Sequence, residues 1–154
     1  MNFSSLLDPD AVRVTSHSSS KKRLLLEISD LCSKAYGVCS SMAVDALLER
    51  ESLGPTGVGH GVALPHARLT DIDRVVGVFL RLEKPMDFGA ADRQPVDLVF
   101  GLFAPANDGV EHLKALALVS RTLRNPATCA KLRSNTNPAA LHAILTAEES
   151  TQAA

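Results

Sequence analysis

The sequence predicts an α/β domain in which a β-sheet lies between layers of helices. Two helical patterns come first, strand-like segments follow, and three further helical patterns complete the chain. Two apolar runs in the middle, residues 75–80 and 96–103, are nearly continuous, which is typical of strands covered on both faces. The length of 154 residues fits one domain. We therefore expect a single domain over residues 1–154, with a frayed tail from Glu148 to Ala154.

The first two helices are indicated by apolar periodicity and by residues that favour helix ends. Ser18–Ser20 offers N-cap hydroxyls, and apolar residues then recur at helical spacing until Gly37 stops the pattern. A second helix is predicted from about Ser41 to Gly54, where a Gly-Pro pair ends it.

The C-terminal part carries further helix signals. Asp108, followed three residues later by Glu111, resembles a capping box, in which each side chain satisfies a backbone N–H at the helix start. Pro126 and Pro138 stand where first-turn prolines begin helices, because proline has no N–H to leave unpaired. We therefore expect a helix after Asp108 and two short helices behind it.

A glycine-rich segment carries the most specific chemical signal. Gly57, Gly59 and Gly61 stand at alternate positions, so they leave one side of an extended segment bare and let a ligand or partner backbone approach closely. A tightly packed strand without a ligand would use the same residues. The spacing matches neither the dinucleotide fingerprint nor the P-loop. Pro65 removes a backbone donor, and we expect a strand to end there with His66 at its exit.

His66 at such an exit is a candidate nucleophile. An unperturbed imidazole has a pKa near about 6.5, so near neutral pH it is largely uncharged and keeps a lone pair. A phosphoryl group is a natural electrophile for it, because phosphoryl transfer needs positioning and hydrogen-bond donors more than a strong base. Two residues can supply donors: Arg50, at the end of the second helix, and His112, in the first turn of the helix after Asp108.

The histidines also allow a different interpretation. His60, His66 and His112 can together bind zinc as neutral imidazoles, which would indicate a metal-dependent hydrolase. However, no carboxylate or thiolate stands at a recognisable ligand spacing, and no G-x-S-x-G motif occurs. We therefore expect neither a metal nor a cofactor. His17 and His142 are interpreted as surface or helix residues.

The composition argues against several classes of function. The 16 basic residues nearly balance the 17 acidic ones, and there is no Trp, so neither a basic face nor a stacking platform for nucleic acid is expected. No apolar run approaches the roughly 20 residues of a membrane span, and the N-terminus does not resemble a signal peptide. Cys32, Cys39 and Cys129 form no CxxC pair, which favours reduced thiols in a cytoplasmic protein.

At these residues the sequence resembles a known family. The motif T-G-x-G-x-G-x-A-x-P-H, within residues 50–69, is the most specific block, and residues 76–104 and 112–133 agree in register. The sequence is similar to the nitrogen-regulatory, PtsN-like type of enzyme IIA of the bacterial phosphoenolpyruvate phosphotransferase system (PTS), a branch of the mannitol/fructose IIA family. The similarity spans most of residues 3–146 and implies a three-layer α/β/α sandwich with a small mixed sheet.

The resemblance also implies roles for individual residues. His66 matches the family's phosphorylated histidine, His112 its second active-site histidine, and Arg50 its conserved arginine near the glycine segment. In this family a small phosphocarrier protein, of the HPr or NPr kind, gives the phosphoryl group to IIA. Nitrogen-type members act mostly by phosphorylation-dependent binding to regulatory targets, so a phosphocarrier and regulatory proteins are the expected partners. Sugar-transporting members instead pass the group on to a IIB component.

Further residues are candidates for phosphate binding or docking, and two of them depart from the family pattern. His60 stands where many relatives carry Asn, and Arg68 follows Ala67 where Gly-Lys is common, so Arg68 keeps a positive charge for docking. The full set of these candidates is Thr56, Gly57, Gly59, His60, Gly61 and Arg68. Two other functions remain open: a sugar-specific IIA subunit, and an interaction module whose site no longer reacts.

Overall fold

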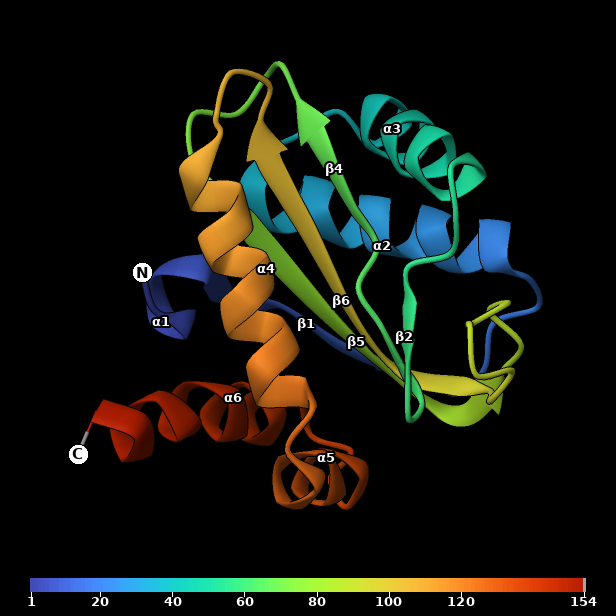
Figure 1. The fold of residues 1–154 in the computed structure, drawn as a ribbon, viewed down its shortest axis with the longest axis vertical. Helices are drawn as coiled ribbons and strands as arrows, with labels where there is room; N and C mark the ends of the chain where they lie inside the picture. Colours follow the sequence, from blue (N-terminus) through green and yellow to red (C-terminus); the bar gives the residue numbers. More distant parts are fainter. Residues whose placement is uncertain (154) are drawn as a thin grey trace.

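The computed structural model describes the backbone of residues 1–153 and the side chains of residues 1–147 (Figure 1). The elements follow the order α1 (Phe3–Leu6), β1 (Leu7–Thr15), α2 (Lys21–Tyr36), α3 (Ser40–Ser52), β2 (Gly57–Gly59), β3 (Val62–Ala63), β4 (His66–Leu69), β5 (Val76–Met86), β6 (Val96–Pro105), α4 (Val110–Leu123), α5 (Pro126–Arg133) and α6 (Pro138–Ala153). The predicted order of helices, strands and helices is present, preceded by a short helix and a strand that the sequence did not indicate.

The strands form one mixed sheet. Its order is β1-β5-β6-β3-β2, and β4 also pairs with β6. β5 and β6 run antiparallel, whereas β1 pairs parallel with β5, and β3 and β4 pair parallel with β6. β6 is thus a central strand, and nearly all of its residues are buried. The strand predicted from the continuous apolar run at 96–103 is therefore confirmed.

Helices cover both faces of the sheet (Figure 1). α2 packs on one face, where Ile28 lies against Gly101 of β6. α1 packs on the other face, where Leu6 lies beside Gly77 of β5. α3 lies next to α2, while α4, α5 and α6 belong to the same layer as α1. The expected three-layer α/β/α fold is confirmed.

The predicted ends of α2 are confirmed. The Ser20 hydroxyl accepts a hydrogen bond from the backbone N–H of Arg23, and Gly37 ends the helix with a left-handed φ of 76°. α3 begins at Ser40, one residue before the predicted start, and ends at Ser52. The Ser20 hydroxyl and the left-handed backbone of Gly37 act within a few residues of the ends of α2, which explains why the sequence indicates those ends.

Only half of the expected capping box forms at α4. The Asp108 carboxylate accepts hydrogen bonds from the backbone N–H groups of Glu111 and His112, at 3.3 and 2.9 Å. The Glu111 side chain turns instead to Lys114, 3.4 Å away, and the Asp108 N–H donates to the Pro105 carbonyl. Asp108 therefore holds the first turn of α4, which carries His112.

The two C-terminal helices begin at the predicted prolines. α5 starts at Pro126 and is capped by the Asn125 side chain. α6 starts at Pro138 and continues to Ala153, so it is longer than predicted. A frayed tail is expected from Glu148 onward. The side chains of residues 148–154 and the backbone of residue 154 lie outside the described part of the chain.

β1 escaped prediction for an identifiable reason. Its sequence contains Pro9 between two aspartates, and proline argues against a strand because it cannot donate to the ladder. The register with β5 shifts between Leu7 and Val12, so Pro9 falls in an irregular stretch of an edge strand. An edge position tolerates this residue, whereas a central strand does not.

The expected single strand over the glycine segment is wrong, because β2 and β3 form an antiparallel hairpin. His60 and Gly61 make its two-residue turn, with φ of 57° and 81°. Positive φ at both central positions is typical of the tight turns that match the twist of a hairpin. As a consequence His66 opens a new strand, β4, instead of standing at a strand exit.

Candidate active site

Three elements bring His66, His112 and Arg50 together. His66 is the first residue of β4, His112 lies in the first turn of α4, and Arg50 lies in the last turn of α3. The two imidazole rings meet edge to face, with centroids 5.5 Å apart. Arg50 Nε lies 3.3 Å from His66 Nε2. The predicted cluster of two imidazoles and a guanidinium is thus grouped around His66, which is partly exposed.

The hydrogen bonds of the His66 ring decide which nitrogen is available for reaction. Nδ1 lies 2.8 Å from the Leu64 carbonyl oxygen, and because a carbonyl only accepts, Nδ1 carries the proton. The neutral ring then keeps its lone pair on Nε2, which accepts a hydrogen bond from Arg50. A neutral ring with a lone pair on an accessible nitrogen is the form that can attack a phosphoryl group.

Burial lowers the pKa of both histidines. For His66 the loss of hydration has the largest effect; the Leu64 carbonyl opposes it and the Arg50 charge adds to it. For His112 burial again comes first, followed by the charges of His66 and Arg68. Because a lowered pKa favours the uncharged ring, both imidazoles are neutral near pH 7.

We expect phosphoryl acceptance to persist under mildly acidic conditions. The pKa of His66 lies below the ordinary value of 6.5, so the Nε2 lone pair is lost only as the pH falls below about 6.5. The labelling rate should be level above this pH and decline below it, with the same midpoint as an NMR titration of the His66 ring. A midpoint above 6.5 would contradict the effect of burial.

The His112 ring, whose centroid lies 5.5 Å from that of His66, carries a nitrogen left unpaired in the described part of the chain. The residue is only 6% exposed, and its Nε2 has no hydrogen-bond partner among the described residues. Buried polar atoms without a partner are uncommon, and a phosphoryl oxygen beside the His66 ring would supply one. Asp108 holds His112 in place through its backbone N–H.

The glycine-rich hairpin packs against other parts of the chain. A Cβ at Gly57 would lie 2.6 Å from Ala90 Cβ, and one at Gly61 would lie 2.5 Å from Arg133 Nη2. A Cβ at Gly59 would similarly lie 3.3 Å from an aspartate carboxylate oxygen. Packing against the backbone at Gly57, and the positive φ of 98° and 81° at Gly59 and Gly61, account for glycine at these positions without a ligand. Their contact with a phosphate stays a prediction.

Gly57→Ala is expected to destabilise the fold. The new methyl group would also lie 2.9 Å from Ala90 Cα, which is backbone and cannot swing aside. Such overpacking costs about 1–3 kcal/mol of unfolding free energy. Urea unfolding measures it, with Gly109→Ala as the control, since a Cβ there meets nothing within 4 Å. Equal midpoints for the two variants would contradict the packing account.

Thr56 and His60 are both engaged by neighbouring side chains. Thr56 is buried, and its hydroxyl donates to the Glu51 carboxylate. The His60 N–H donates to Asp92 at 3.0 Å, and its carbonyl accepts from Arg133 Nη2 at 2.8 Å, while the residue itself is exposed at the hairpin turn. Contacts of these two side chains with a phosphate stay predictions.

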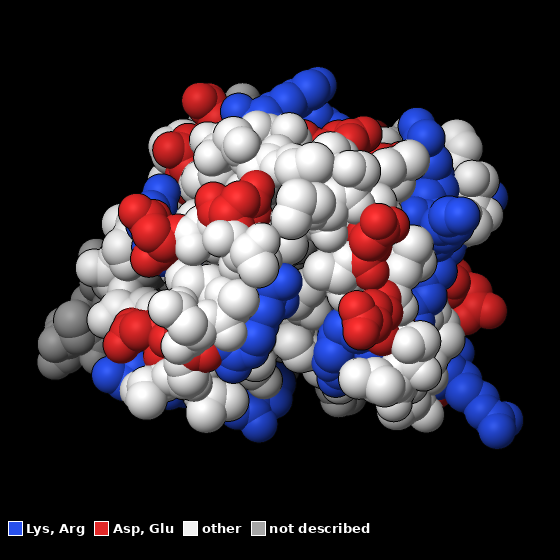
Figure 2. All heavy atoms as spheres, turned by 90° about the horizontal axis from the view of Figure 1, so that it is seen from above, with Lys and Arg blue, Asp and Glu red and all other residues white. Residues whose placement is uncertain are grey.

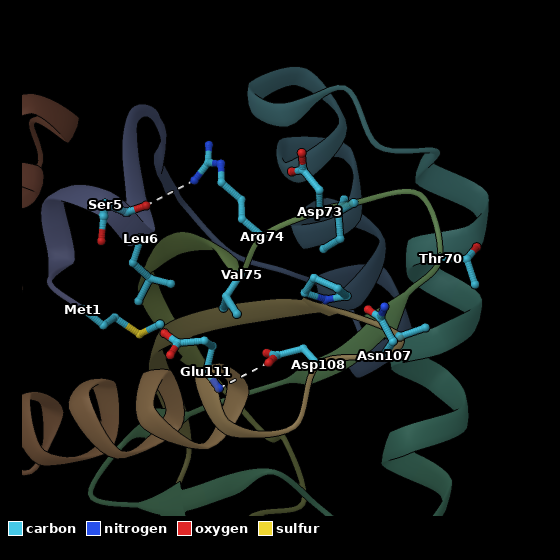
Figure 3. A pocket seen from close by; sticks show the side chains of 13 residues that line it. Met1, Ser5, Leu6, Thr70, Asp73, Arg74, Val75, Asn107, Asp108 and Glu111 are labelled. Carbon is cyan, nitrogen blue, oxygen red and sulfur yellow. Dashed lines mark hydrogen bonds between the residues drawn. The ribbon is translucent and has the colours of Figure 1, made fainter.

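Arg68 braces the start of α4. It is exposed, and its Nη1 donates to the carbonyls of Pro105, at 3.3 Å, and of Asp108. A cavity of about 770 Å³ adjoins the same turn, and Asp108 and Glu111 lie on its wall (Figure 3). Its lining includes neither His66 nor Arg50, so the cavity and the histidine cluster are separate features.

The described part of the chain contains no group of three or more His, Cys, Asp or Glu residues placed to hold a metal ion. The zinc interpretation of His60, His66 and His112 therefore lacks a ligand set there.

Comparison with known proteins decides the family. The sequence profile described as "Phosphoenolpyruvate-dependent sugar phosphotransferase system, EIIA 2" matches residues 5–148. The chain belongs to this family. The nitrogen regulatory protein of Klebsiella oxytoca is 42% identical to this EIIA chain over 147 residues, or 95% of this chain and 91% of that protein. The nitrogen regulatory protein of Bradyrhizobium diazoefficiens is 39% identical over 153 residues, or 99% of this chain and 100% of that protein.

A solved structure agrees with this assignment. The crystal structure of the nitrogen regulatory protein IIA-Ntr from Neisseria meningitidis superposes on this EIIA chain with a TM-score of 0.84 and 32% identity, over 92% of this chain and 97% of that one. The resemblance to the nitrogen-regulatory type, first drawn from the motif around His66, is confirmed.

Sequence reasoning missed several residues that hold the site of this EIIA chain. Arg133 of α5 contacts Asp97 of β6 through both Nε and Nη2, each 2.9 Å from a carboxylate oxygen, and the same guanidinium reaches the hairpin turn. Asp97 lies in the block at residues 76–104 that carried the family resemblance, which was the available signal. Glu51, next to Arg50, was missed as well, because an acidic residue near a helix end suggests only a solvated surface.

Proposed function

We propose that this chain accepts a phosphoryl group on Nε2 of His66 from an HPr- or NPr-like phosphocarrier, and that its phosphorylation state regulates partner proteins. The observation that carries the proposal is the state of the His66 ring. Its Nδ1 proton faces the Leu64 carbonyl, and its Nε2 lone pair lies 3.3 Å from Arg50 Nε. Membership of a phosphotransfer family supports the same chemistry.

The proposed transfer needs little movement of protons. The Nε2 lone pair attacks phosphorus, and the bond between phosphorus and the leaving atom of the carrier breaks, returning its electron pair to the carrier. Nδ1 keeps its proton because the Leu64 carbonyl accepts it. Arg50, released from the lone pair, turns to one phosphoryl oxygen. His112 donates a hydrogen bond from its Nε2–H to another. The product is a phosphoramidate with a high transfer potential, so the step is reversible.

A regulatory role is favoured over sugar transport. The nitrogen regulatory proteins reported above match this chain over nearly their whole length. Phosphorylation adds about two negative charges at His66, which changes the partners that this surface can bind. The second candidate is a sugar-specific IIA subunit that passes the group to a IIB component, as members of the same family do.

Exposed apolar side chains support protein docking around the site. Leu53, just after α3, is 81% exposed, and Val110 and Leu113, on either side of His112, are 62% and 67% exposed. Such side chains on the elements that carry a reactive group indicate an interaction surface. Figure 2 shows acidic and basic side chains interspersed on one face of the molecule, without a broad patch of one sign. On this face the charge pattern favours a protein partner over a nucleic acid, which would require a broad basic patch.

The proposed setting is the cytoplasm. The described cysteines, Cys32, Cys39 and Cys129, are all free thiols, which suits a reducing compartment. None of the helices in the described part of the chain is long and apolar enough to cross a bilayer. The proposed step uses the protein's own groups and calls for no cofactor.

A reconstituted phosphotransfer assay tests this function. The chain is incubated with radiolabelled phosphoenolpyruvate, enzyme I and a phosphocarrier, and it should acquire a label that is lost in acid and stable in alkali. Addition of a mannitol- or fructose-type IIB protein should leave most of the label in place. Rapid passage to IIB would favour the sugar-specific alternative, and absence of any label would favour the interaction module.

A further inference from the structure

Glu51 is a buried carboxylate beside the reactive cluster. Its side chain is 6% exposed, and it follows Arg50 directly in α3. Its Oε2 lies 2.6 Å from Lys21 Nζ and 3.3 Å from the backbone N of Thr56, while its Oε1 accepts from the Thr56 hydroxyl. Burying a carboxylate is costly unless it is paired and hydrogen-bonded. The ion pair and hydrogen bonds of Glu51 therefore require Lys21 and Thr56 to be held in these positions.

Lys21 is the counter-ion that joins two helices. It is the first residue of α2, and its ammonium lies 4.4 Å from the centre of the Phe88 ring as well as against Glu51. The side chain of Lys21 is 31% exposed. The pair therefore ties the start of α2 to the end of α3.

Two paths lead from Glu51 to the His66 ring. Along the first, Thr56 is held by Glu51, the Thr56 carbonyl accepts from the Leu64 N–H at 2.9 Å, and the Leu64 carbonyl contacts His66 Nδ1 at 2.8 Å. Along the second, the neighbouring Arg50 donates from Nε to His66 Nε2, while its Nη1 donates to the Gly54 carbonyl at 3.0 Å.

Each ring nitrogen thus contacts a group whose position depends on the segment 50–56. These groups are the Leu64 carbonyl, which is held through Thr56, and the Arg50 guanidinium. Loosening that segment would release the carbonyl that keeps the proton on Nδ1 and the guanidinium that faces Nε2. A histidine that exchanges its proton between the two nitrogens presents the nucleophilic lone pair on Nε2 for only part of the time.

We propose that Glu51, with Lys21 as its counter-ion, is a positioning residue for phosphoryl transfer, because it fixes the tautomer and orientation of His66 through Thr56 and Arg50. This inference rests on the proposed function of His66. Glu51 acts from behind the site and does not contact the transferred group. The Thr56 hydroxyl serves the same network, which gives it a use besides the predicted phosphate contact.

Glu51→Gln tests the inference, with Glu49→Gln as the matched control. Glu49 lies on the same helix and is exposed, so its replacement removes the same charge without touching the network. We expect the maximal labelling rate of the Glu51 variant to fall about tenfold or more, as misplaced reacting groups do. The phosphocarrier concentration for half-maximal rate should stay within about twofold, because the docking surface is intact.

A second readout concerns the unphosphorylated ring. In nitrogen-15 NMR spectra, native His66 should show one neutral tautomer with the proton on Nδ1, and Glu51→Gln should show a mixture. This readout is independent of phosphotransfer, so it decides the inference even when the native chain takes no label and the proposed function fails. The native tautomer together with the native rate would overturn the proposal, as would a rate that falls only in proportion to the unfolded fraction.

Lys21→Gln is the second variant, used if Glu51→Gln does not fold. Lys21 lies outside the reactive cluster, yet its loss leaves the Glu51 carboxylate without its counter-ion. We expect a smaller fall in rate, about threefold, with the same change of tautomer. A Lys21 variant identical to the native chain in both readouts would contradict the network.

Discussion

No phosphoryl label is expected on His66→Ala. The account places the nucleophilic lone pair on Nε2 of this residue alone, because Leu64 holds the proton on Nδ1 and Arg50 faces Nε2. Removal of the ring removes the only bond-forming atom, so the loss should be complete instead of partial. The measurement is the label retained after incubation with phosphoenolpyruvate, enzyme I and the phosphocarrier.

Two controls separate lost chemistry from lost structure. His17→Ala, at an exposed position, should keep the native label. His66→Ala should still unfold cooperatively in urea. The lost hydrogen bond to the Leu64 carbonyl is worth about 1 kcal/mol, which is a small part of the unfolding free energy of a domain. Label that persists on a folded His66→Ala chain would show that another residue is the acceptor.

Arg50→Met should produce the second largest effect. Arg50 Nε lies 3.3 Å from His66 Nε2, the proposed reacting nitrogen, and loss of one such donor to the developing charge costs about 10²-fold in rate. Arg50→Lys should recover only part of the loss, because an ammonium keeps the charge but not the planar fork. The initial rate of labelling at saturating phosphocarrier measures both variants.

The stability of the Arg50 variants distinguishes a chemical role from a structural one. In the native fold Arg50 Nη1 donates to the Gly54 carbonyl, so its removal should cost about 1 kcal/mol of unfolding free energy. A rate loss far larger than this destabilisation supports the assigned role. Native labelling kinetics in Arg50→Met would remove Arg50 from the mechanism.

The features that the sequence predicted well depend on local chemistry. Ser20 and Gly37 bound α2 as expected, because N-cap and left-handed C-cap preferences act within a few residues. His66, His112 and Arg50 were identified as a set because their segments match a family motif. Neither periodicity nor spacing could have shown that three separate elements bring them together.

The features that escaped prediction depend on contacts between distant segments. The glycines of the hairpin face Ala90 and Arg133, residues far along the chain, so the pattern alone left both ligand approach and packing open. The tautomer of His66 follows from a backbone carbonyl, that of Leu64, and a carbonyl has no sequence signature. Glu51 became informative only once Lys21 and Thr56 were seen to surround its carboxylate.

The most direct test is to determine which nitrogen carries phosphorus in the phosphorylated chain. Phosphorus-31 and nitrogen-15 NMR spectra distinguish a phosphoryl group on Nε2 of a histidine from one on Nδ1. The account predicts a single phosphohistidine, at His66, with phosphorus bonded to Nε2 and the proton retained on Nδ1. Phosphorus on Nδ1 of His66, or on any other residue, would contradict it.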